Sequence, residues 1–137
     1  DLRTRFDSQA TTNLEEIQAS RAHLDGAFLD GAYLHRAELD DSHLEGASLV
    51  GAFLERANLD GADLRGADLS RSSLQFASLR GADLTNAKLV GTLMTSADLT
   101  GAQLCGADLS NASVATTIWD QASACAETHW PQQEPPL

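Results

Sequence analysis

Leucine recurs at every fifth residue along most of the chain, and a small residue stands two places before almost every leucine. The segment Gly61–Ser70, GADLRGADLS, shows two such repeats. In the phase of Leu64, seventeen of the nineteen positions from 24 to 114 are leucine, and Met94 and Val114 fill the other two. The positions two residues earlier hold sixteen alanines, so both columns are predicted to be buried.

Neither an α-helix nor a flat strand can bury both columns. A step of five residues turns a helix by about 500°, which scatters the leucines around the axis. In a strand, side chains alternate with a period of two, so an odd repeat sends successive leucines to opposite faces. Each repeat is therefore predicted to contain a short extended piece followed by a turn.

The two residues after each leucine are predicted to form this turn. All ten glycines of the chain stand at its second position, where glycine supplies the positive φ that tight turns often need. Where Arg36, Arg56, Arg71 or Phe76 takes that position, we expect a type I turn, which accepts most residues. If every turn is about a right angle, four repeats close a square of twenty residues, and the squares stack at about 4.8 Å.

A stack of such coils carries its leucines along the central axis, as solenoid proteins do. The core residues predicted to lie above one another are Leu24, Leu44, Leu64, Leu84 and Leu104. The fold class that follows is an all-β solenoid of about five coils, each made of four pentapeptides.

The repeat also carries a family resemblance. The pattern A(D/N)LXX, present at Ala57–Leu59, Ala62–Leu64 and Ala67–Leu69, resembles that of the bacterial pentapeptide-repeat proteins. The resemblance covers residues 21–115 and implies a right-handed quadrilateral β-helix, a handedness that the spacing alone does not provide. This leucine-rich version most resembles the small members from photosynthetic bacteria and thylakoid lumens.

Short helices are predicted to cover both ends of the β-helix. Residues 13–20 combine a capping box at Thr12 and Glu15 with an apolar stripe. Residues 117–130 carry a second capping signal and apolar residues at helical intervals. The predicted division is an N-terminal segment with capping helix at 1–20, the repeats at 21–116, and a capping helix with a polar, proline-rich tail at 117–137.

The net charge of −11 argues against direct binding of nucleic acid or of an anionic membrane surface. No apolar run approaches the roughly 20 residues that span a bilayer. The start at Asp1 without a methionine is compatible with removal of an export signal. We therefore expect an exported protein of a thylakoid lumen or periplasm, with a cytoplasmic protein as the alternative, that exists as a monomer or weak homodimer and binds an unknown protein partner.

The two cysteines fall at the same end of the predicted rod. Cys105 lies at a corner of the last complete coil, and Cys125 follows twenty residues later. A disulfide between them would fix the C-terminal cap and would place the protein in an oxidising compartment. The alternative is a pair of free thiols in a reducing cytoplasm.

Histidines suggest a metal site only weakly. His23 and His43 are predicted neighbours on adjacent coils with Asp63 below them, which makes a conceivable ladder of ligands. Histidine on a solvated wall is more often polar surface, so we expect no metal and no cofactor. The common catalytic motifs are absent, and a straight rod has no cleft where a nucleophile and a base could converge, so we expect no enzyme.

One outward column carries large apolar side chains. Tyr33, Phe53 and Leu93 are predicted to stack on one wall, with Phe28 on the neighbouring wall. Outward aromatic residues on a soluble rod can mark a contact site for a partner or a second copy. Alternatively, their stacking across strands only strengthens the sheet.

The leading functional hypothesis is a non-enzymatic scaffold that presents rigid walls to a protein partner. The alternative is a DNA-mimicking inhibitor or protector of a type II topoisomerase such as gyrase, because some members of the family imitate the shape and charge of duplex DNA. Those members tend to stack phenylalanine in the core and to dimerise through a C-terminal element. Here no central position is phenylalanine, and the C-terminal segment is predicted to be a lid.

Overall fold

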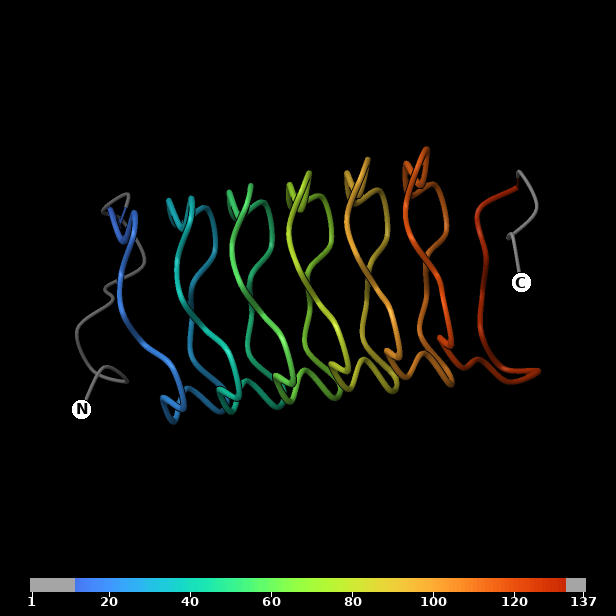
Figure 1. The fold of residues 1–137 in the computed structure, drawn as a ribbon, viewed down its shortest axis with the longest axis horizontal. Coiled ribbons are helices and arrows are strands. Elements are labelled where there is room, and N and C mark those ends of the chain that lie inside the picture. The colour runs from blue at the N-terminus through green and yellow to red at the C-terminus, as the bar shows by residue number, and fades with distance from the viewer. Residues whose placement is uncertain (1–11, 133–137) are drawn as a thin grey trace.

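The chain winds into a stack of coils that lie side by side along the long axis of the molecule, from the blue coil at one end to the red coil at the other (Figure 1). The computed structural model describes residues 12–132. Parallel bridges join residues twenty positions apart along most of this range, from Asn13 with Tyr33 to Gln103 with Ser123. One coil is therefore twenty residues long, and its four repeats give it four corners.

Each repeat contributes one bridging residue and one turn. The carbonyl of Leu24 accepts the N–H of Ala27 at 3.0 Å, which closes the turn. The N–H groups of Leu24 and Gly26 donate to the next coil, at 2.7 and 2.9 Å from the carbonyl oxygens of His43 and Glu45. The described residues contain neither a helix nor a strand longer than a single bridge. Hydrogen bonding between coils thus satisfies the backbone groups that a helix would pair within itself.

Leucine side chains fill the axis of the stack. Leu44, Leu64, Leu84 and Leu104 have no exposed surface, and Leu24 is 4% exposed. The column two residues earlier is also buried, including its few polar members. One of these, Thr92, donates its hydroxyl to the carbonyl of Leu69 at 2.9 Å, so its polar group is satisfied inside the core. Burial of each leucine contributes about 2 kcal/mol before the loss of chain entropy is counted.

The expectation of type I turns at corners without glycine was wrong. Arg36, Arg56, Arg71 and Phe76 have φ values of 55°, 60°, 58° and 60°, close to the 64° to 72° of the glycines. Positive φ at the third residue of a turn is the mark of type II geometry. The stack enforces it, because the N–H at this corner must reach the next coil, as that of Arg36 does to the carbonyl of Glu55 at 3.0 Å. A left-handed conformation costs about 1–2 kcal/mol for such residues, which the inter-coil hydrogen bonds and the buried core offset.

The helix predicted at residues 13–20 was also wrong. The coil pattern already runs through this segment: the N–H groups of Leu14 and Ala19 donate to the carbonyls of Tyr33 and Glu38 at 2.7 and 2.8 Å. Leu14 and Ala19 occupy the central position of the repeat, so the apolar pattern that suggested a helical stripe is the five-residue pattern continued. Stacking on a finished coil supplies more hydrogen bonds than an isolated two-turn helix can form.

The helix predicted at residues 117–130 is replaced by further repeats in the same way. Trp119 takes the central position and is buried, and Trp130 packs against it edge to face, with ring centroids 5.6 Å apart. The last coil is one residue longer than the others, because Asp108 bridges His129 rather than residue 128. The tryptophan pair thus closes the C-terminal end of the leucine column without a helix.

The first eleven residues of the predicted N-terminal segment and the part of the predicted tail beyond residue 132 lie outside the described residues. Between residues 12 and 132 the structure has no helix long and apolar enough to cross a membrane.

Candidate interaction surface

We call the wall formed by residues 33–36, 53–56, 73–76, 93–96 and 113–116 the aromatic wall. Tyr33 and Phe53 bridge each other across adjacent coils, and their rings stack with centroids 5.0 Å apart and planes 15° apart. Phe53 is 38% exposed and Leu93, two coils further on, is 45% exposed. Ser73 is buried in the same column between them. The small side chain of Ser73 therefore separates the apolar pair Tyr33 and Phe53 from Leu93.

His35 extends this surface, and sequence reasoning missed it. Its ring lies 6.0 Å from that of Tyr33 and 5.9 Å from that of Phe53, nearly parallel to both. Its Nε2 lies 3.0 Å from the Glu55 carboxylate, and its Nδ1 lies 3.7 Å from that of Glu15. The sequence could have predicted the contacts of His35 with the two glutamates, since residues 15, 35 and 55 share one column of the twenty-residue coil.

Phe76 is a second residue that sequence reasoning treated only as a corner. Its side chain is 58% exposed, and the guanidinium of Arg56 lies 5.5 Å from its ring centroid. A cation over an aromatic face is attractive and holds the ring in place. Phe76 therefore presents an exposed aromatic ring, held in place by Arg56, at the edge of the aromatic wall.

The C-terminal part of the aromatic wall carries no charge. Residues 73–76, 93–96 and 113–116 contain only serine, threonine, glutamine, alanine and apolar side chains. The next wall is acidic and carries Glu38, Asp40, Asp41, Asp60, Asp98 and Asp120. In a protein of net charge −11, the outward positions among these residues form an uncharged surface that needs no counter-charge when it is covered, with Leu74 and Met94 buried in the core behind it.

Phe28 lies apart from this column. It bridges Ser48 on the preceding wall and is 72% exposed. Among the described residues, none of the ring contacts includes Phe28. The structure thus brings Tyr33 and Phe53 together and leaves Phe28 as a separate exposed ring.

The two cysteines form a disulfide that links successive coils. The S–S distance is 2.10 Å, and the Cα atoms of Cys105 and Cys125 lie 4.9 Å apart. The extra residue of the last coil falls between Ser123 and His129, next to this link. The bond therefore joins the irregular last coil to the regular one before it.

On the wall opposite the aromatic wall, His23 and His43 bridge each other, and their ring centroids lie 4.5 Å apart. Asp63, the third member of the ladder expected from the sequence, is bound instead to Arg65, with 2.6 Å between guanidinium and carboxylate. The hydrogen bond from Arg65 holds the pKa of the Asp63 carboxyl below its usual range, although partial burial opposes the shift.

The chain belongs to the pentapeptide-repeat family, because the family model for pentapeptide repeats matches it in eight copies over residues 12–48, 37–75 and 72–113. This confirms the resemblance found in the sequence. Solved members of the family form right-handed quadrilateral β-helices, in agreement with the four-cornered coil of twenty residues. The family consists generally of non-enzymatic structural repeat proteins.

Three solved structures show the likeness in detail. A pentapeptide repeat protein from Nostoc PCC 7120 is 35% identical, with a TM-score of 0.67, over 68% of this chain and 77% of its own. One from the thylakoid lumen of Arabidopsis thaliana is 31% identical, with a TM-score of 0.69, over 70% and 67%. One from the cyanobacterium Cyanothece 51142 is 29% identical, with a TM-score of 0.58, over 74% of this chain, which spans 65% of that protein.

A more distant likeness is to a plasmid-mediated fluoroquinolone resistance protein, with 17% identity and a TM-score of 0.55 over 78% of this chain and 64% of its own. At that identity the likeness shows a shared fold alone. No curated protein sequence matches the chain.

Proposed function

We propose that the protein is a non-enzymatic scaffold that binds a protein partner through the aromatic wall. The observation that carries the proposal is the outward apolar column of Tyr33, Phe53 and Leu93 on a wall whose C-terminal part is uncharged, beside a wall that is mainly acidic. Interfaces are enriched in aromatic side chains and depleted in charge at their centre. This wall carries the aromatic side chains, and its charged residues Arg36, Glu55 and Arg56 are confined to its N-terminal part. Pentapeptide-repeat proteins as a family fit a structural or interaction role.

The surface also defines the chemistry of the partner. Tyr33, Phe53 and Leu93 offer an apolar column, and the partner needs aliphatic or aromatic side chains to cover it. The adjoining acidic wall would meet the rim of such a partner, so the rim should carry lysine or arginine. Because inter-coil hydrogen bonds hold the wall rigid, binding orders few side chains on this side of the interface.

Affinity capture from an extract of the native organism tests this proposal. The wild-type protein should retain a partner, and Tyr33→Ser with Phe53→Ser should lose it while the circular dichroism spectrum stays unchanged. Asp83→Ser with Gln103→Ser is the matched control, because it makes two outward substitutions on the opposite wall. Equal capture by both double variants would show that the aromatic column is only structural.

The same variants test self-association. If the apolar column pairs two copies of the chain, light scattering should show a dimer for the wild type and a monomer for Tyr33→Ser with Phe53→Ser. A monomeric wild type that still captures a partner assigns the wall to a different protein.

The acidic wall favours a second candidate function, which is inhibition or protection of a type II topoisomerase by imitation of DNA. Asp40 and Asp60 occupy the same position in adjacent coils, and Glu38, Asp98 and Asp120 add negative charge along the same wall of the rod. Against it, the core formed by residues 12–132 contains no phenylalanine, and the last coil in that range is packed by two tryptophans. A gyrase supercoiling assay decides: no effect at micromolar protein removes this candidate.

For the location of the protein we propose an oxidising compartment outside the cytoplasm, such as a thylakoid lumen or periplasm. The disulfide supports it, because thiols in a reducing cytoplasm stay unpaired. The likeness to a protein of the Arabidopsis thylakoid lumen points the same way. Titration of denatured protein from the native source, without reductant, should find no free thiol, and two reactive thiols would refute the proposal.

A further inference from the structure

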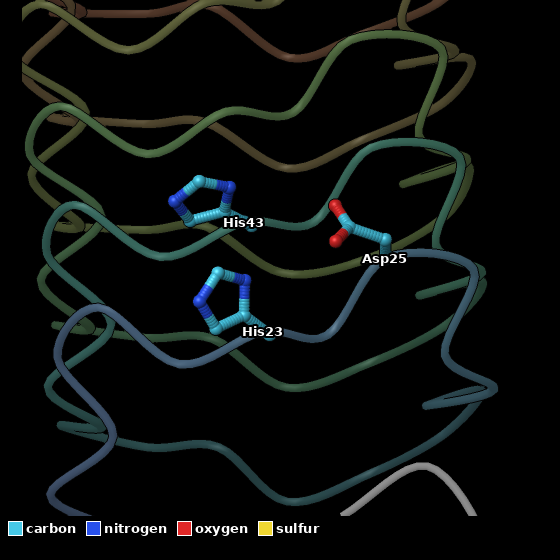
Figure 2. Close-up of side chains that lie close together, drawn as sticks. All are labelled: His23, Asp25 and His43. Atoms are coloured by element: carbon cyan, nitrogen blue, oxygen red, sulfur yellow. The ribbon is translucent and has the colours of Figure 1, made fainter.

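Two histidines and a carboxylate meet on the wall opposite the aromatic wall. Figure 2 shows the rings of His23 and His43 one above the other on adjacent coils, with the carboxylate of Asp25 turned toward them. One ligand atom from each of the three side chains lies within 4.8 Å of the other two. Both histidines are exposed and Asp25 is half-buried, so an ion can enter directly from solvent.

The backbone fixes the three residues relative to one another. His23 and His43 form a parallel bridge, and the carbonyl of His43 accepts the N–H of Leu24 at 2.7 Å. Asp25 follows at the corner, where its Oδ1 accepts the N–H of Glu45 at 3.3 Å. The ladder thus holds both rings on one side of the wall, and the backbone hydrogen bond orients the carboxylate as outer-shell partners do in metal sites.

The neighbouring carboxylates have another partner. The guanidinium of Arg65 lies 3.0 Å from the carboxylate of Glu45 and 2.6 Å from that of Asp63. Both acids next to His43 on the C-terminal side therefore share the single positive charge of Arg65. The carboxylate that groups with the two rings is that of Asp25, not that of Asp63, which was suggested by the sequence.

We propose that His23, His43 and Asp25 bind a divalent first-row transition metal ion such as Zn²⁺. Two imidazole nitrogens and one carboxylate oxygen are ligands that zinc accepts, with water in the fourth position. Calcium and magnesium prefer sites made entirely of oxygen ligands, which this cluster does not offer.

Only side-chain rotation is needed to close the site. Zinc bonds of about 2.0–2.1 Å place tetrahedral ligand atoms about 3.3 Å apart, so atoms now within 4.8 Å of one another need to approach by at most about 1.5 Å. The backbone can stay in its ladder, because both imidazoles are exposed to solvent and contact each other across adjacent coils. A bound ion would join two adjacent coils near the N-terminal end.

The test must distinguish the proposed site from two other places in the chain that carry possible metal ligands. Cys105, Cys125 and Glu127 also lie close together, but the sulfurs form a disulfide and offer no thiolate. His35 lies on the aromatic wall between two glutamates, so His35→Gln removes one histidine and leaves the proposed site intact. Oxidised full-length protein and this control variant isolate the His23, Asp25 and His43 cluster.

Calorimetric titration of the oxidised protein with zinc chloride tests the proposal. One equivalent should bind the wild type and His35→Gln alike, while His43→Gln and Asp25→Asn should bind at least about tenfold more weakly, since even outer-shell losses reach that size. Zinc should also raise the thermal midpoint of the wild type and not that of His43→Gln. Unchanged zinc affinity in His43→Gln or in Asp25→Asn, or its loss in His35→Gln, overturns the three-ligand site.

Discussion

The buried column and the outward walls of the same repeats follow different rules. Leucine occupies the central position in nearly every coil, whereas the residue just before it changes from His43 to Asp63 to Gln103 within one column. The inward positions alone determine the coil, because they must pack and pair identically at each level. The outward positions are free to differ, so an apolar wall, an acidic wall and a histidine pair can share one scaffold.

Removal of the disulfide tests whether an outward feature can matter as much as the core. Cys105→Ser with Cys125→Ser should cost about 3 kcal/mol, because the bond closes a loop across the sequence separation of 20 residues. The loss should concentrate in the last coil, where hydrogen exchange of residues 119–129 should quicken. Wild-type protein treated with reductant is the control and should behave in the same way. Unchanged exchange there would mean that the tryptophan pair alone holds the end.

Two adjacent substitutions compare an inward with an outward position directly. Ala62 has no exposed surface, so Ala62→Leu should overpack the wall and cost about 1–3 kcal/mol. Asp63→Leu adds the same side chain one residue later, toward solvent, and should change the free energy of unfolding much less. Denaturant unfolding with a shared slope measures both values. Equal losses would contradict the assignment of inward and outward positions.

The smallest expected effect lies in the ion pair of Asp63 with Arg65. The pKa of the Asp63 carboxyl is held below its usual value in the folded protein, mainly by the hydrogen bond from Arg65. Its contribution to stability is therefore fully present above the unfolded pKa of about 4 and is lost as the pH falls through the lower folded pKa. Asp63→Asn should make the acid limb of the stability profile slightly shallower, and high salt should reduce the difference. An identical acid limb in both proteins would show that the pair contributes nothing.

The five-residue spacing was sufficient to predict the length of the coil and the leucine axis, because only one winding can bury two columns at that interval. It could not predict the ends. Thr12 and Glu15 fit a capping box and also fit the continued repeat, and the choice depends on hydrogen bonds to the next coil. The turn geometry at Arg36 and Phe76 has the same origin, since local preference favours negative φ and the stack imposes positive φ.

The candidate sites were predictable only in part, because columns of residues follow from the spacing and side-chain partners do not. Counting by twenty placed Tyr33 over Phe53 and His23 over His43. It could not show that Arg65 would bind Asp63, or that Asp25 would turn toward the histidines. These contacts depend on which rotamer each side chain adopts and on which carboxylates pair with Arg65. The spacing of the repeat determines neither.

The last coil differs from the internal layers in its core residues. Every internal layer presents the same edge above and below, so nothing within the repeat itself defines how many layers there should be. In the last coil Trp119 takes the place of a central leucine and packs edge to face against Trp130. Duplication of an internal twenty-residue unit would therefore lengthen the rod by one layer and keep its terminus, which makes length an adjustable property of this protein.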